Sequence, residues 1–554
     1  MKTPPKPKKI AKKLKNHNDN RTDYYYWLRD DKRINKKILQ YLDDENEYSK
    51  YWFKENKVNS KKIFESYKKS IPKNEVGFKK KLDEYEYFST QTLREEYRKY
   101  YRIYKKKKKQ ILDVNKLAKN KSYYSISSIY PSRNHKYLAY GEDTNGRREY
   151  SIVIKDVKNN KNFEINSCSS TGSVIWNKSS DGYFYLKKDP DTLITNSLFF
   201  HKLGTDTKKD KLIFREKDKQ FNLSFSLSRT KKYLFLQVSK TESNEVWYLD
   251  LEEMNTKPKC FLKRRNKHLY QIDDTPNNFY ILSNKNNKKN FELYKTNLTN
   301  IPEINWKTVV PHKNNEFIED FLCFKDFIVL EIRKNGLPNI VKINKKSNKR
   351  TFIKFKDDAY TVNLIDNDDY NSRFFSFVYS SLKTPSSIFS QDLYSDKRKK
   401  LWKQKINNYK ENRYEIKRIN IIARDKTKVP ISLIYKKGIN LKKAPLLQYG
   451  YGSYGLIIEP SFKLSFMPLI DEGFIFAIAH IRGGQDLGRD WYDQGRMMKK
   501  MNSFYDFIDC TKKLIRRGIG SKNRIFAMGG SAGGLLMGAI INLEPQLYKG
   551  IVSA

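Results

Sequence analysis

The stretch Arg524-Ile525-Phe526-Ala527-Met528-Gly529-Gly530-Ser531-Ala532-Gly533-Gly534 decides the fold of the C-terminal part of the chain. A short apolar run enters a glycine-rich turn, and the helix-forming run 535–540 follows it. This is G-x-S-x-G in the strand, turn and helix setting that the motif requires for a nucleophilic serine. The glycines two residues before and two after Ser531 carry no Cβ, so strand and helix can approach closely. The pattern predicts a serine hydroxyl presented at a helix N-terminus.

The segments before this turn alternate between strands and helices. Such alternation indicates a mostly parallel sheet covered by helices, so residues 405–554 are predicted to form an α/β-hydrolase domain. The expected elements are a hairpin at 416–422 and 429–435, buried strands at 445–449 and 474–480, a helix at 504–515 and a strand at 524–528.

A serine nucleophile needs two donors for the oxyanion that forms when it attacks a carbonyl. The backbone amide of Ala532 is one, because it follows the nucleophile directly. The loop Tyr449-Gly450-Tyr451-Gly452-Ser453-Tyr454-Gly455 follows a buried strand about 80 residues earlier, where hydrolases commonly place the second donor. We predict that the phenol of Tyr451 is this second donor. The alternative, that these tyrosines only pack, stays open.

Residues 73–404 have a different texture, with short aromatic and β-branched runs between Asn, Asp, Gly, Ser and Lys turns. Such runs are typical of strands. Seven aromatic anchors recur every 46 to 50 residues, the period of four-stranded propeller blades. We therefore predict a seven-bladed β-propeller; a β-sandwich array with accidental regularity is the alternative. The anchors are Tyr87-Phe88, Tyr137-Leu138, Tyr183-Phe184, Tyr233-Leu234-Phe235, Phe279-Tyr280, Phe327-Ile328 and Phe374-Phe375.

Residues 1–72 are polar and helix-prone. Apolar positions from Ile34 to Tyr51 fall at mixed three- and four-residue steps, which predicts an amphipathic helix. A helix with one apolar face must bury it against another element. We expect this helix to dock on another part of the chain.

Composition narrows the class of protein. The 554 residues are 38% hydrophobic and 14% aromatic, which excludes a disordered chain. The net charge of +49 could indicate a nucleic-acid-binding protein. However, Lys and Asn are enriched along the whole length, whereas a binding face would concentrate its charge. We therefore expect no nucleic acid partner; salt-sensitive retention on DNA would favour one.

Several classes of site and location are disfavoured. The cysteines at 168, 260, 323 and 510 lie far apart without metal-ligand spacing, so we expect reduced thiols, no metal site and no required cofactor. No apolar run approaches the roughly 20 residues of a membrane-spanning helix. No apolar segment of a signal peptide follows the basic N-terminus. The expectation is a soluble, cytoplasmic protein without membrane contact.

Four stretches together resemble the prolyl oligopeptidase family of serine peptidases, and within it the oligopeptidase B branch. They are Tyr24 to Asp31, Ala423-Arg424-Asp425 before Val429-Pro430, the tyrosine loop, and Ala479-His480-Ile481-Arg482-Gly483-Gly484 through Trp491-Tyr492. The resemblance implies a seven-bladed propeller that caps an α/β-hydrolase domain, with the N-terminal segment 1–72 packed on the hydrolase domain. It also implies cleavage of short peptides after Lys or Arg.

The same resemblance implies the roles of particular residues. Ser531 would be the nucleophile, and the Tyr451 phenol with the Ala532 amide would form the oxyanion hole. Glu459, Tyr454 and Arg482 would bind substrate, with Glu459 facing a basic residue. Ser461 lacks a carboxylate that some relatives carry, so that subsite departs from the family pattern.

The chain also departs from the family's catalytic triad. In this fold the Asp or Glu and the His follow the nucleophile, yet residues 532–554 contain neither His nor Asp. Without a base the chemical step should fall about a millionfold, and His480 is expected to pack. We expect a truncated product or incomplete record whose hydrolase part is unstable alone. The alternative is a decayed, non-catalytic propeller that binds peptides or partners; oligomeric state cannot be read.

Overall fold

The structure, a computed structural model, describes residues 2–56, 60–253, 257–365, 367 and 369–554. It divides into two compact units, residues 1–69 and 70–554. Each unit is described by itself below. No helix in these ranges is both long and apolar enough to cross a bilayer. The four cysteines are free, with Cys323 and Cys510 buried.

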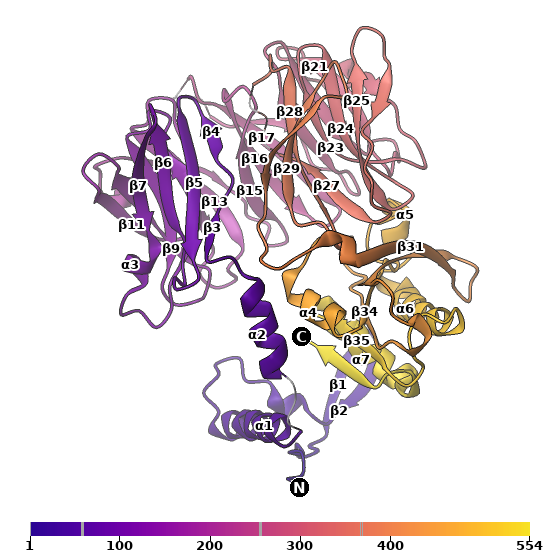
Figure 1. The fold of residues 1–554 in the computed structure, drawn as a ribbon. Helices are drawn as coiled ribbons and strands as arrows, with labels where there is room; N and C mark the ends of the chain where they lie inside the picture. The colour runs from indigo at the N-terminus through magenta and orange to yellow at the C-terminus, as the bar shows by residue number, and fades with distance from the viewer. Residues whose placement is uncertain (1, 57–59, 254–256, 366, 368) are drawn as a thin grey trace. The chain divides into compact units, whose positions relative to one another are not determined.

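The first unit contains a hairpin and helices. Strands β1 (Lys12–Asn16) and β2 (Asp19–Asp23) pair antiparallel, followed by η1 (Tyr26–Leu28), α1 (Lys36–Glu55) and α2 (Ser60–Ser70) (Figure 1). Helix α1 confirms the predicted amphipathic helix, and the Asn35 side chain caps it by accepting from the Lys37 amide. The hairpin was not predicted because its strands are polar; His17 and Asn18 close it with positive φ. Packing of this segment on the hydrolase stays a prediction.

Residues 74–403 form sheets of antiparallel strands. In the described part of this region, five sheets have the four or five strands of a propeller blade, and one has seven strands. The first sheet contains β3 (Asn74–Val76), β4 (Lys80–Leu82), β5 (Tyr85–Thr92), β6 (Lys99–Tyr104) and β7 (Lys107–Asp113). The seven-stranded sheet contains β8 (Ser125–Pro131), β9 (Tyr137–Asp143), β10 (Tyr150–Asp156), β11 (Lys161–Trp176), β12 (Gly182–Lys188), β13 (Thr195–Lys202) and β14 (Lys211–Arg215).

The other four sheets follow in chain order, each with four strands. They are β15 (Asn222–Leu227), β16 (Tyr233–Lys240), β17 (Ser243–Asp250) and β18 (Lys259–Leu262); β19 (Tyr270–Asp274), β20 (Asn278–Ser283), β21 (Glu292–Asn297) and β22 (Lys307–Val310); β23 (Phe317–Cys323), β24 (Phe327–Lys334), β25 (Leu337–Asn344) and β26 (Arg350–Phe352); and β27 (Tyr360–Leu364), β28 (Phe374–Ser381), β29 (Ser387–Asp392) and β30 (Arg398–Lys403). Short helices are α3 (Val114–Ala118), η2 (Thr207–Lys209), η3 (Glu303–Asn305) and η4 (Glu411–Arg413).

The prediction of seven separate blades is therefore wrong: five discrete blades are present. The reason is β11, which runs unbroken through 16 residues. Its first half pairs with β10 and its second half with β12, so that hydrogen bonds join two expected blades into one sheet. All seven aromatic anchors do lie on strands, namely β5, β9, β12, β16, β20, β24 and β28. They pack between neighbouring sheets, as Tyr233 does on Phe279 with ring centroids 5.4 Å apart.

The hydrolase sheet has the order β31-β32-β34-β33-β35-β36. Strands β31 (Tyr414–Ile422) and β32 (Lys428–Lys436) confirm the predicted hairpin. Strand β33 (Leu446–Tyr449) pairs parallel with β34 (Ile475–Ala479) and β35 (Ile525–Gly529), and β35 with β36 (Gly550–Ser553). Around it lie η5 (Leu441–Lys443), η6 (Leu464–Phe466), α4 (Met467–Asp471), α5 (Arg489–Asp493), η7 (Met497–Lys499), α6 (Met501–Arg516), α7 (Ala532–Leu543) and η8 (Pro545–Leu547).

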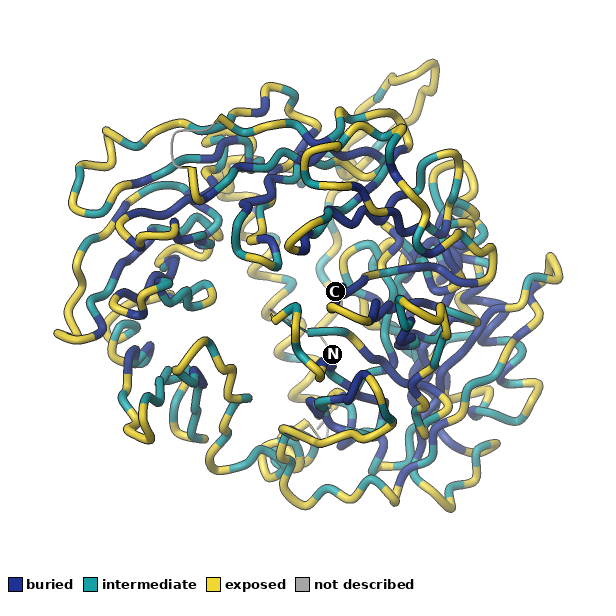
Figure 2. Tube along the Cα trace, turned by 90° about the horizontal axis from the view of Figure 1, so that it is seen from above, coloured by how far each residue is buried: buried dark blue, intermediate teal, exposed yellow. Residues whose placement is uncertain are grey.

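The central strands β33 and β34 are buried on both faces, as in a sheet covered by helices. Ile525, Ala527 and Leu446 are fully buried and pack with Phe507 of α6 and Leu536 of α7. Figure 2 shows this pattern across the chain, with buried segments following the strands and exposed ones at the turns. The carboxyl ends of β33 and β35 consequently lie side by side, and the loops that leave them meet at one edge of the sheet.

Candidate active site

Ser531 occupies a strained turn between β35 and α7. Its backbone has φ 56° and ψ −119°, a region that side-chain-bearing residues adopt at a cost of about 1–3 kcal/mol. A Cβ on Gly529 would lie 2.4 Å from the Gly533 carbonyl oxygen, so only glycine fits there. Ser531 itself is exposed. The tight turn therefore holds the serine out of the packed interior, as predicted from the motif.

The Ala532 amide is free among the described backbone amides that follow Ser531. The Ser531 amide donates to the Ala554 carbonyl at 2.7 Å, and the amides of Gly533 and Gly534 donate to Gly530 and Ser531. Among the described residues the Ala532 amide has no acceptor. It is the first residue of α7, where the helix dipole favours negative charge. This amide is available for an oxyanion formed at Ser531.

The tyrosine loop, residues 449–455, lies beside the serine turn. The Gly450 amide donates to the Met528 carbonyl at 3.2 Å, which joins this loop to the end of β35. The Tyr451 ring packs against the first turn of α7: its Cδ2 lies 3.5 Å from the position of a Cβ on Gly533. Its phenol has no hydrogen-bond partner in the described ranges. Tyr451 and Ala532 thus both offer an unpaired donor next to the turn that presents Ser531.

Glu459 lies at the contact between hydrolase and propeller residues. Its carboxylate pairs with the guanidinium of Arg333 on β24, whose Nε also lies 3.1 Å from Glu319 Oε1. Burial opposes the charge of Arg333, but these two carboxylates outweigh it and raise its pKa. One oxygen of each carboxylate is buried without a hydrogen-bond partner. The residue predicted to face a basic substrate side chain thus already holds an internal cation.

Arg482 lies in the interior. Its guanidinium makes two hydrogen bonds to Asp506 of α6, at 2.9 and 2.6 Å, and an ion pair with Asp425 at 2.7 Å. Only 6% of the residue is exposed. These contacts tie the end of β34 to α6. The substrate contact that the resemblance implied for Arg482 stays a prediction. Tyr454, by contrast, is 75% exposed, so its predicted substrate contact remains open to test.

His480 makes two side-chain hydrogen bonds in the core. Its Nε2 lies 2.8 Å from Ser432 Oγ and its Nδ1 lies 2.9 Å from Asp486 Oδ1. The three groups have the order of a Ser-His-Asp triad, yet Ser432 is fully buried and can meet no substrate. This agrees with the packing role predicted for His480. Sequence reasoning missed Ser432 and Asp486, and no motif marks them.

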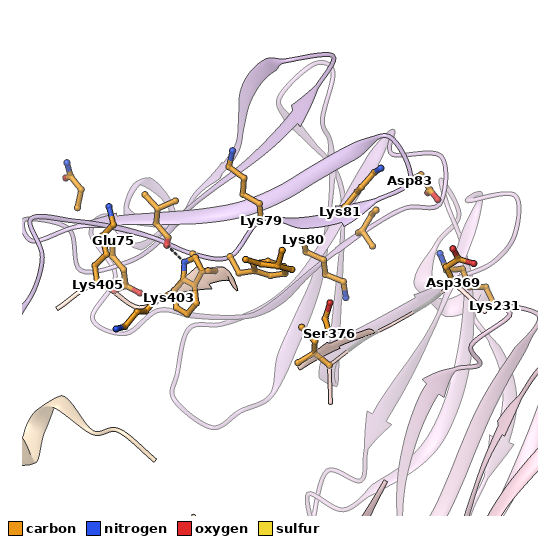
Figure 3. Close-up of a pocket in the computed structure, with 18 residues that line it drawn as sticks. Glu75, Lys79, Lys80, Lys81, Asp83, Lys231, Asp369, Ser376, Lys403 and Lys405 are labelled. Carbon is orange, nitrogen blue, oxygen red and sulfur yellow. Dashed lines mark hydrogen bonds between the residues drawn. The ribbon is translucent and has the colours of Figure 1, made fainter. Parts of the chain in front are cut away.

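A large cavity lies elsewhere in the described residues. It has a volume of about 1040 Å³, and residues of the first and last propeller sheets line it. Figure 3 shows Lys79, Lys80, Lys81, Lys403 and Lys405 around it. It contains none of the predicted catalytic residues. In the described ranges, no group of three or more His, Cys, Asp or Glu side chains has a metal-binding arrangement.

Comparison with known proteins gives consistent matches. The family described as "Prolyl oligopeptidase, N-terminal beta-propeller domain" matches residues 4–404, and the "Prolyl oligopeptidase family" matches residues 460–554. Dipeptidyl aminopeptidase BI of Pseudoxanthomonas mexicana is 32% identical over 97% of this chain and 77% of its own. Protease 2 of Moraxella lacunata is 31% identical over 98% and 80%.

Solved structures agree with these matches. Oligopeptidase B from Leishmania major superposes with a TM-score of 0.93 at 25% identity, covering 100% of this chain and 82% of its own. Oligopeptidase B from Trypanosoma brucei, in a closed form with covalently bound antipain, gives 0.92 at 28% identity with the same coverage.

Proposed function

The chain belongs to the prolyl oligopeptidase family of serine peptidases, and from that premise we propose that Ser531 is its nucleophile and that its substrates are short peptides cleaved after Lys or Arg. The proposal rests on three groups that lie together at the turn after β35. An exposed serine with φ 56° is flanked by a free amide at Ala532 and a free phenol at Tyr451. Neither donor has another partner in the described ranges, so both are free to bind an oxyanion.

The proposed reaction proceeds through an acyl-enzyme. Ser531 Oγ attacks the peptide carbonyl carbon, and the negative charge that moves to the carbonyl oxygen is bound by the Ala532 N–H and the Tyr451 O–H. The C–N bond then breaks, the amine leaves with a proton, and water releases the acyl group. The base that accepts the serine proton follows the nucleophile in this fold. Residues 532–554 contain neither His nor Asp, so the proposal applies to a chain that carries such a pair.

The preference for basic substrates rests on Glu459. A carboxylate attracts a Lys or Arg side chain, and one oxygen of Glu459 is buried without a hydrogen-bond partner. Its other oxygen pairs with Arg333. A Lys or Arg side chain of the substrate would therefore either bind the Glu459 carboxylate together with Arg333 or displace Arg333 from it. Relatives named protease 2 and oligopeptidase B are consistent with peptide substrates.

A fluorophosphonate probe tests the nucleophile. In a chain that continues past Ala554 with an Asp and a His, we expect covalent labelling at Ser531, and none in the S531A variant. Substrate choice is then tested with matched peptides that differ only in the residue directly before the scissile bond, which is Lys, Arg or Leu. Absence of labelling in the extended chain, with its fold intact, would rule out the peptidase.

One observation favours a second candidate, a non-catalytic protein that binds peptides or partners. Of the six histidines in the sequence, only His480 belongs to the predicted hydrolase segment, and it is buried. This candidate predicts that peptide binding persists without turnover. Isothermal titration with a Lys-containing peptide, run beside the labelling experiment, separates the two.

A further inference from the structure

Lys500 connects the start of α6 to the tyrosine loop. Its ammonium donates to the Gly452 carbonyl, to Ser453 Oγ at 2.7 Å, and to Ser503 Oγ at 3.5 Å. An ammonium has three N–H donors, and these three acceptors use all of them. Two of the acceptors belong to the loop that carries Tyr451. The side chain is partly buried beneath that loop.

The Gly452 carbonyl that Lys500 binds is held tightly. A Cβ on Gly483 would lie 2.0 Å from this oxygen. Ser503 Oγ lies 3.4 Å from it, but the single hydroxyl hydrogen has a closer acceptor in the Arg482 carbonyl at 2.7 Å. Gly452 has φ 67° and directly follows Tyr451. The Gly452 carbonyl lies in the rigid peptide plane that joins Gly452 to Ser453. Fixing it anchors the loop one residue after Tyr451, so that only the φ and ψ of Gly452 separate the anchored plane from Tyr451.

Lys500 keeps its charge without a counterion. Burial lowers its pKa to about 8, and in the described ranges no carboxylate lies within salt-bridge distance of its Nζ. The nearby charges on the packed elements are Asp506 of α6 and Asp425, and both pair with Arg482. The phenols of Tyr449, Tyr451 and Tyr454 are the titratable groups of the loop itself. A cation in this position is held by its contacts to the loop, not by an ion pair.

We propose that Lys500 is a positioning residue that holds the tyrosine loop so that the Tyr451 phenol faces the oxyanion formed at Ser531. This inference rests on the proposed function. It adds a residue 31 positions before the nucleophile. Among the described residues, Lys500 reaches the site through its bonds to Gly452 and Ser453 of the loop. The neutral amine formed at high pH binds the Gly452 carbonyl more weakly, because charge-assisted hydrogen bonds are the stronger ones.

The first test uses kinetics in the catalytically complete chain. The variant K500M removes the ammonium and keeps the stem, K500R keeps the charge, and K499M is the control because Lys499 is exposed and bonds Gln494. We expect K500M to lower kcat roughly 10- to 100-fold with little change in KM, somewhat less than the loss for removing an oxyanion donor. K500R should recover part of it, and K499M should match wild type.

A double-variant cycle separates positioning from general damage. If Lys500 acts through the phenol, K500M should lower kcat far less in a Y451F background than in wild type, because the two residues act as a unit. Wild-type activity should also fall as pH rises through about 8, and K500M should lack that step. Equal and independent losses from K500M and Y451F would overturn the inference while leaving the proposed function intact.

A second measurement needs no activity. With 4-fluorophenylalanine, whose ring does not titrate, placed at position 451 of the 554-residue chain, the fluorine resonance should shift with a midpoint near pH 8 in wild type and K499M. It should broaden and lose that transition in K500M. If K500M does not fold, the presence or absence of the pH transition in the wild-type chain tests the inference. A resonance unaffected by pH 7 to 9, or unchanged in folded K500M, would overturn the inference even if Ser531 proves unreactive.

Discussion

At the scale of single residues, the site depends on glycines that permit close backbone contacts. Ser531 adopts a positive φ because the chain must turn sharply from β35 into α7. The turn closes only because Gly529 approaches the Gly533 carbonyl without a Cβ between them. Strain of this kind persists where the surroundings over-determine the conformation. Here the tyrosine loop and the first turn of α7 supply that constraint.

The variant G529A tests this dependence. Its Cβ would meet the Gly533 carbonyl at 2.4 Å, so backbone must move. We expect a loss of stability of about 1–3 kcal/mol in urea unfolding and a loss of probe labelling at Ser531. The matched control is G538A, because nothing lies within 4 Å of a Cβ there and alanine favours a helix by up to about 1 kcal/mol. Equal stability of G529A and wild type would contradict the close packing of the turn.

At the scale of elements, contacts between distant strands and loops decide two features. The continuous β11 merges two expected blades, because its two halves pair with different strands. The loop after β33 carries Glu459 to Arg333 of β24, 126 residues earlier in the chain. Arg333 is only 2% exposed at its side chain and links Glu459 with Glu319. A propeller strand thereby becomes part of the surroundings of the candidate site.

Substitution of Arg333 tests how much its contacts with Glu319 and Glu459 contribute to stability. In R333M the carboxylates of Glu319 and Glu459 lose their buried cation, which should lower the free energy of unfolding by about 3–5 kcal/mol. The control K334M removes the neighbouring charge, whose side chain is 39% exposed, and should change it by less than about 1 kcal/mol. Urea unfolding followed by tryptophan fluorescence measures both. Similar small losses in the two variants would show that the contacts of Arg333 with Glu319 and Glu459 contribute little to stability.

At the scale of the whole molecule, residues 405–554 place β36 at one edge of the hydrolase sheet. Strand β36 pairs with β35 only, among the described residues, and Val552 is 52% exposed. An exposed apolar edge strand is a template for pairing with another chain. The predicted instability of the hydrolase part therefore has a specific location. The net charge of +49 opposes association, but it is spread over the chain and does not shield this edge.

The edge strand gives a prediction for residues 1–554 expressed as they stand. We expect concentration-dependent self-association by light scattering, and a marked decrease in V552K, because an edge lysine opposes strand pairing. The control L543K adds the same charge at the end of α7, where Leu543 is 42% exposed, and should leave association nearly unchanged. Equal effects of both variants would mean that net charge, and not the edge, controls association.

The sequence by itself determined the features that depend on local pattern. Backbone geometry limits which residues fit the turn at Ser531, so G-x-S-x-G in its setting predicted the strand, the strained serine and the helix. Strand and helix periodicity likewise predicted the hydrolase hairpin, β33 to β35 and α6, and the aromatic anchors predicted where strands recur.

Only the tertiary structure decided the features that depend on contacts between distant residues. The merging of two blades through β11, the capture of Glu459 by Arg333, the burial of Arg482 and the reach of Lys500 to Gly452 join positions that no local pattern relates. The physical reason is that a charged side chain looks the same in sequence whether it meets solvent, substrate or an internal partner. Its free energy, and so its role, is set by burial and by the charges the fold brings to it.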